Sequence, residues 1–154
     1  MDIKFRKPVK SDSKEIITWK YEGVYSFYNN DKTEAKKQGI ENMYKEDSSY
    51  IMCNNKDEIL GHCSFDFDED DREYFLGVQM RPDLVGKGNG KKYLDSILEF
   101  GRNKYKFSTI MLLVTSFNKR AHKLYLNLGF EEVERFETVC NDEEVEFIVM
   151  KKNY

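Results

Sequence analysis

The chain has 154 residues, of which 40% are apolar and 14% aromatic, enough to bury one sizeable core. We therefore expect a single domain over residues 1–154. The net charge of -3, with Lys and Arg scattered along the sequence, gives no reason to expect nucleic acid or an anionic membrane as a partner.

The cysteines and the apolar runs bear on the cell compartment. The three cysteines lack C-x-x-C spacing, which disfavours both a disulfide framework and a structural zinc site. The first residues contain no hydrophobic signal core, and the longest apolar run, residues 110–114, is too short to span a bilayer. We expect a soluble, cytoplasmic protein without a metal.

The first half of the chain predicts helices between short strands. Hydrophobic periodicity and turn residues mark the boundaries. In chain order we expect a strand at 3–5, a helix capped by Ser11 or Asp12 that carries Trp19, a short helix or loop at 21–30, a helix near 33–45, and strands at 49–53, 58–67 and 74–80. Residues 66–71 form an acidic turn before the last of these strands.

The second half predicts two helices and three strands. A long helix follows Gly88, a buried strand spans 109–115, a helix starts after Asn118, and two strands close the chain near 130–139 and 144–150. The order β-α-α-β-β-β-α-β-α-β-β predicts an α/β fold with a mixed sheet. The strands through Val78 and Val114 should run parallel, because one helix connects them.

A glycine loop stands at the start of the long helix. Residues 85–90 read Val-Gly-Lys-Gly-Asn-Gly, directly after a strand. Unpaired N–H groups at such a helix start form an anion site, and glycine lets the backbone approach a phosphate. The spacing fits neither the P-loop nor the dinucleotide fingerprint, because Lys92 and Lys91 occupy positions where those motifs need Ser/Thr and glycine.

A second motif covers residues 118–130. Asn118 is a good N-cap, and an apolar stripe with i, i+3, i+4, i+7 spacing follows it, with Tyr125 as its aromatic member. Gly129 is placed to end the helix before Phe130 enters a strand. An amphipathic helix alone would explain the stripe, but not the co-occurrence of Asn118, Tyr125 and Gly129-Phe130 in this order.

These two motifs resemble those of the GNAT N-acetyltransferases, R/Q-x-x-G-x-G/A and N-x-x-A-x-x-L-Y-x-x-x-G-F. The resemblance covers nearly the whole chain, although Val85 stands where the family has Arg or Gln. It implies the mixed, centrally splayed sheet of the family and acetyl-CoA as co-substrate. It also implies the cofactor-binding residues, which are Asn118 and Tyr125, the backbone of Val78, Gln79 and Met80, and the pyrophosphate loop of Gly86, Lys87, Gly88, Asn89, Gly90 and Lys91.

The resemblance also implies catalytic roles. Tyr125 would be the general acid that protonates the departing thiolate, unless it serves only to pack the helix. Asn118 would contact the pantetheine arm or act purely as an N-cap. Some relatives carry the general base, a Glu, at the position of Leu113, which cannot serve here. Other relatives carry a Glu close to Glu73, which is therefore a weak candidate for the base, with a solvated surface role next to the acidic turn as the alternative.

The acceptor amine is left open by the sequence. Aromatic residues over 19–28, with Glu22 and the acidic turn, would suit a cationic amine, but the same aromatics would also serve as core or as a dimer face. We expect direct attack of a primary amine, from a small molecule or a protein N-terminus, on the thioester. The alternative is a non-catalytic acyl-CoA-binding or regulatory module. Either a monomer or a homodimer is compatible with the sequence.

Overall fold

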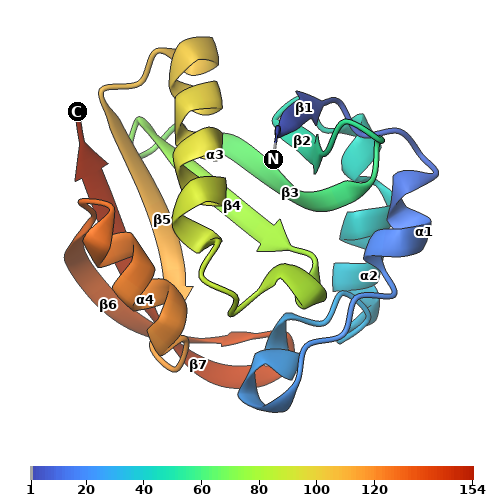
Figure 1. The fold of residues 1–154 in the computed structure, drawn as a ribbon. Helices are drawn as coiled ribbons and strands as arrows, with labels where there is room; N and C mark the ends of the chain where they lie inside the picture. The colour runs from blue at the N-terminus through green and yellow to red at the C-terminus, as the bar shows by residue number, and fades with distance from the viewer. Residues whose placement is uncertain (1) are drawn as a thin grey trace.

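A computed structural model describes residues 2–154 of the chain (Figure 1). It confirms the predicted order of strands and helices, shows the segment expected as a short helix or loop at 21–30 as the 3-10 helix η1, and adds two further 3-10 helices, η2 and η3. In chain order the elements are β1 (Lys4–Arg6), α1 (Asp12–Ile16), η1 (Gly23–Tyr28), α2 (Glu34–Glu41), η2 (Met43–Lys45), β2 (Ser49–Cys53), β3 (Ile59–Asp68), β4 (Glu73–Met80), η3 (Pro82–Leu84), α3 (Gly90–Tyr105), β5 (Thr109–Thr115), α4 (Lys119–Asn127), β6 (Glu131–Cys140) and β7 (Glu143–Asn153).

All seven strands form one mixed sheet in the order β1-β2-β3-β4-β5-β7-β6. Every neighbouring pair is antiparallel except β4 and β5, which run parallel and are connected through α3. The predicted parallel crossover is therefore confirmed. The hairpin between β6 and β7 turns at Asn141 and Asp142, whose φ angles of 51° and 64° match the two left-handed residues of a type I′ turn.

The two parallel strands stay together over only a short distance. β4 and β5 pair from Tyr74 with Ile110 to Leu76 with Leu112. Beyond these pairs, β4 continues against β3 as far as Met80, and β5 continues against β7 as far as Thr115. The sheet therefore opens between the C-terminal ends of β4 and β5, as expected from the family resemblance.

The helices cover both faces of this sheet (Figure 1). The larger core cluster joins residues of α3 and α4 to one face, which includes Phe65, Leu112 and Ile148. A smaller cluster around Ile16, Trp19 and Ile51 packs α1 and η2 against the other face. Because side chains alternate along a strand, Gln79 and Thr115 lie on this second face, next to the opening of the sheet.

Two N-terminal helices are shorter than the sequence predicts. The helix expected to carry Trp19 ends at Ile16, and Trp19 reaches the core from the loop that follows. The helix expected near 33–45 begins after its cap Thr33, stops at Glu41, and is followed by η2. In both cases a residue after the helix, Trp19 or Met43, packs into the smaller core cluster, and this tertiary contact outweighs the local preference for a longer helix.

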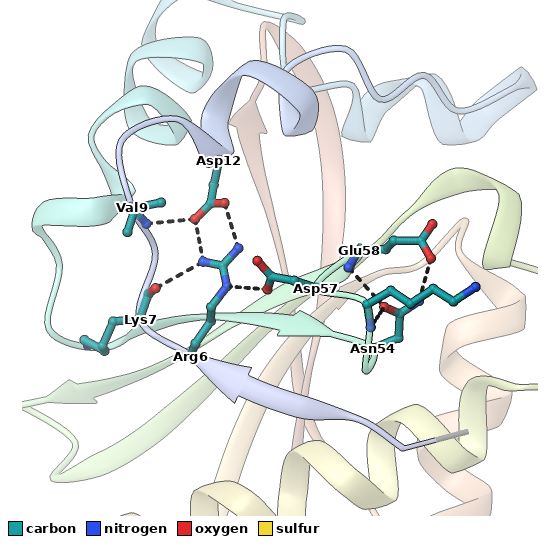
Figure 2. Close-up of polar contacts among 8 residues, drawn as sticks. Arg6, Lys7, Val9, Asp12, Asn54, Asp57 and Glu58 are labelled. Atoms are coloured by element: carbon teal, nitrogen blue, oxygen red, sulfur yellow. Dashed lines mark hydrogen bonds and ion pairs between the residues drawn. The ribbon is translucent and has the colours of Figure 1, made fainter.

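Asp12 has a different role from the helix cap that the sequence suggests. Figure 2 shows its buried carboxylate between the Arg6 guanidinium, at 2.8 and 2.9 Å, and the backbone N–H of Val9, at 2.7 Å. Arg6 also donates to Asp57 in the turn between β2 and β3, at 3.1 Å. This network attaches the start of α1 to the edge of the sheet. No helix within residues 2–154 has the length and apolar character needed to cross a membrane.

Candidate functional site

The glycine loop follows η3 and leads into α3 beside the opening of the sheet. Gly86 and Gly88 have φ angles of 76° and 79°, which a side chain would strain. Asn89 precedes the first helical residue, and its side chain makes no capping hydrogen bond. The first N–H groups of this 16-residue helix are therefore free of a side-chain cap and can bind an anion.

The two sequence motifs meet at this loop. A β carbon on Gly90 would lie 2.8 Å from Leu124 Cδ2, and one on Gly86 would lie 2.8 Å from Arg120 Nη1. The exposed Arg120 guanidinium is also stacked over Tyr25 of η1, with its Cζ 4.6 Å from the ring centroid. Arg120 thus provides a cation at the loop, although Val85 does not.

The residues of β4 expected to bind pantetheine lie where the sheet has opened. Val78, Gln79 and Met80 pair with β3 on one side and have no strand partner on the other. The Met80 carbonyl accepts a hydrogen bond from the Tyr21 hydroxyl, so one lone pair of this oxygen remains for another donor. The Gln79 side chain points to the second face and donates to the Tyr28 carbonyl at 3.0 Å.

Asn118 and Tyr125 stand on α4 near the same opening. Asn118 is the N-cap, since its side-chain oxygen accepts from Ala121 N at 3.2 Å. Its amide nitrogen also approaches the Tyr28 hydroxyl at 3.4 Å, a long contact. The half-buried Tyr125 ring packs edge-on against Phe130, and burial raises the pKa of Tyr125 to about 12. Its hydroxyl therefore stays protonated at neutral pH.

Tyr28 joins the two separated strands on the second face of the sheet. Its hydroxyl lies 2.6 Å from Thr115 Oγ1 at the end of β5, while its carbonyl accepts from Gln79 of β4. The same carbonyl accepts from Lys36 Nζ at 2.8 Å. Burial lowers the pKa of Lys36 to about 8.

His62 completes this network from β3. Its Nε2 lies 2.8 Å from Gln79 Oε1, which also accepts from Asn30 at 2.8 Å. Burial is the main cause of its lowered pKa, and the nearby Lys36 charge acts in the same direction. A neutral histidine therefore supports Gln79 on the second face of the sheet, beside the opening.

Glu73 lies at the other end of β4, where β4 and β5 are still close together. Its carboxylate accepts from the Thr109 hydroxyl and from Lys151 Nζ, the latter at 3.1 Å. The Thr109 hydrogen bond, together with the Lys151 ion pair, lowers the pKa of Glu73. The acidic turn over 66–71 precedes Glu73, so it too lies at the end of β4 away from Met80. This placement does not favour either feature as part of the acceptor site.

The lysines of the loop are solvent-facing. Lys91 pairs with Asp95 one turn along α3, at 2.6 Å, and both side chains are largely exposed. Such surface pairs contribute little to stability and are easily exchanged for another partner. Lys87 is also exposed. The loop N–H groups and Arg120 are better placed than Lys91 to define an anion site.

Several residues of the site were not singled out from the sequence. Arg120 occupies a variable position of its motif, and Lys36 and Thr115 belong to no motif. Val85, at the position where the family has Arg or Gln, was the available signal to look for a cation from another element near the loop. No comparable signal marked Lys36, because its position depends on how α2 packs against η1.

Comparison with known proteins identifies the family. The model of the acetyltransferase (GNAT) family matches residues 14–130. The chain belongs to the GNAT family. It is therefore an acyltransferase of the N-acetyltransferase type, as the motif resemblance predicted.

Solved structures agree with this fold. A chimera of the spermidine N-acetyltransferase SpeG from Vibrio cholerae with hSSAT has a TM-score of 0.77 at 17% identity, covering 98% of this chain and 95% of that one. A protein described as a phosphinothricin N-acetyltransferase gives 0.74 at 15% identity, covering 99% and 98%. A GNAT acetyltransferase from Bacillus anthracis gives 0.72 at 14% identity, covering 98% and 94%. Comparison with curated proteins gives no significant match.

Proposed function

We propose that the protein uses acetyl-CoA to acetylate a primary amine, with the whole chain 1–154 acting as one transferase domain. The observation that carries this proposal is the opening between β4 and β5, because the glycine loop and the Asn118 helix meet beside it. The family implies the co-substrate, and the unpaired edge of β4 in the opening supports this place for its pantetheine arm.

The chain offers separate groups to the two ends of the co-substrate. The loop N–H groups from Gly86 to Lys91 and the Arg120 guanidinium would hold the pyrophosphate. The unpaired backbone edge from Val78 to Met80 would bind the pantetheine amides in the manner of an additional strand. Acetyl-CoA supplies the activated thioester.

Tyr125 is the proposed general acid. The amine attacks the carbonyl carbon, the carbon–sulfur bond breaks, and the Tyr125 hydroxyl donates its proton to the departing sulfur. Its raised pKa keeps this proton available at neutral pH. Asn118 orients the site by capping α4 and by its contact with Tyr28.

No carboxylate is proposed as the general base. Glu73 is engaged by Thr109 and Lys151, and its lowered pKa makes it a weak proton acceptor. Leu113, at the position of the base in some relatives, is 44% exposed on β5. We propose that the acceptor loses its proton to solvent through water.

Thiol release from acetyl-CoA tests this function with a panel of primary amines. Turnover with at least one amine, abolished by removal of acetyl-CoA and confirmed by mass of the product, is the expected result. Val85 and Leu113 also favour a second function, a non-catalytic acyl-CoA-binding module. Stabilisation by coenzyme A without turnover of any amine would favour that module.

A further inference from the structure

Lys36 is a half-buried cation without an acidic partner. Its Nζ donates to the Tyr28 carbonyl at 2.8 Å and lies 5.9 Å from the centre of the Tyr28 ring. Within residues 2–154, no Asp or Glu forms an ion pair with it, and none contributes to its pKa. A charged group removed from water in this way is stabilised when a counter-ion binds.

The position of Lys36 relates it to the reacting groups. Tyr28 accepts from Lys36 and Gln79 at its carbonyl and contacts Thr115 and Asn118 at its hydroxyl. The ammonium therefore lies on the second face of the sheet beside the opening, and Tyr28 connects it to Thr115 at the end of β5. An acceptor whose amine points toward Asn118 would place its other end toward Lys36.

No carboxylate of residues 2–154 compensates for this cation. The electrostatic effect of Cys140, at the end of β6, raises the pKa of Lys36, but by less than burial lowers it. Lys36 has a pKa of about 8 and is mostly protonated at pH 7. Glu143, at the start of β7, is paired with Lys32 at 3.0 Å. The acidic turn that suggested a cationic acceptor lies beyond the far end of β4. A polycationic amine would meet a like charge here, whereas an anionic group would meet an unpaired opposite charge.

We propose that the acceptor is an amine that also carries an anionic group such as a carboxylate, and that Lys36 binds this group. The inference rests on the proposed transferase function. Lys36 is thus a specificity-determining residue.

The experiment compares acceptors that differ only in the anionic group. Thiol release is measured with α- and ω-amino acids and with the carboxamide of each, for the wild type, Lys36→Met and Lys36→Arg. We expect kcat/KM of the wild type to favour the acid over its amide by roughly tenfold or more, as for a close charge pair. Lys36→Met should bring this ratio close to one, mainly through KM, and Lys36→Arg should retain most of it.

Lys37→Met is the matched control, because Lys37 is the next half-buried lysine of α2 and its side chain has no hydrogen bond to Tyr28. The Tyr28 carbonyl keeps the Gln79 hydrogen bond in Lys36→Met, so we expect this variant to fold, and melting temperatures verify it. The inference is overturned, and the proposed function is not, by either of two results. One is a wild-type kcat/KM for the amides equal to or higher than that for the acids, and the other is an equal loss of kcat/KM for acids and amides in folded Lys36→Met. Absence of thiol release with every amine overturns the proposed function, and the inference with it.

Discussion

Arg120 of α4 lies against Gly86 of the glycine loop, with its Nη1 2.8 Å from the position of a β carbon on that glycine. The contact joins two motifs that are separated by α3 and β5 in the sequence. It also places a guanidinium, the side chain best suited to bind phosphate oxygens in pairs, at a loop whose first position is Val85. The loop that lacks the family cation at its first position thus has the guanidinium of another element beside it.

Arg120→Gln should weaken coenzyme A binding. A hydrogen bond to a charged group contributes about 1.5–3 kcal/mol, so Kd should rise roughly ten- to a hundred-fold. Calorimetric titration at low and high salt measures this change, and the salt dependence of Kd should decrease. Lys119→Gln removes the same charge from the neighbouring exposed position and should leave Kd nearly unchanged. Equal effects of both variants would show that only the general charge of α4 matters.

Gly88→Glu should abolish the thermal stabilisation by coenzyme A. A ligand that binds only the folded state raises the melting temperature, and a carboxylate on this loop would repel the pyrophosphate. A β carbon at Gly88 meets no atom within 4 Å, so the cost to the fold comes from its φ of 79°. Gly88→Gln carries the same strain and size without the charge, and should keep part of the thermal shift. A full shift in Gly88→Glu would disprove the loop assignment.

Tyr125→Phe should lower kcat by roughly ten- to a thousand-fold with little change in KM for acetyl-CoA, as expected for loss of a general acid. The ring contact with Phe130 is retained, so the melting temperature should change little. Because the pKa of Tyr125 is about 12, the wild type should not lose activity through its ionisation below pH 10. Unchanged kcat at unchanged stability would remove Tyr125 from the mechanism.

His62 should make the fold sensitive to mild acid. Its pKa is lowered in the folded protein, chiefly by burial, from the ordinary value of 6.5. The unfolded chain therefore binds the proton first, and stability present above pH 6.5 should be lost progressively as pH falls below it. His62→Gln can still bond Gln79 and does not titrate. The melting temperatures of variant and wild type, measured from pH 7.5 to 5, should converge or cross as pH falls, and parallel curves would contradict this.

The sequence predicted those parts of the fold that depend on local patterns. The strand Thr109–Thr115 and the helix capped by Asn118 appear where apolar periodicity and the cap placed them. Trp19 could not be placed in this way, because it packs with residues distant in sequence such as Ile51. Lys36 could not be placed because its contact with the Tyr28 carbonyl depends on how the chain folds between η1 and α2, which no local pattern marks. The same holds for the candidate site. The glycine loop and the cap Asn118 are defined motif positions and could be predicted, whereas Arg120 occupies a variable motif position and Lys36 lies outside both motifs.

The short pairing of β4 with β5 has a consequence for motion. Within residues 2–154, three residue pairs of strands β4 and β5 join the half-sheet β1–β4 to the half-sheet β5-β7-β6. The larger core cluster under α3, the contacts of Tyr28, and the bonds of Glu73 to Thr109 and Lys151 are further links. This seam has fewer paired residues than the strand pairs on either side of it, so we expect it to open before either half unfolds. A molecule bound along the seam would hold both halves at once. Amide hydrogen exchange should therefore slow on both sides of it when coenzyme A is added, in β4 as well as in β5.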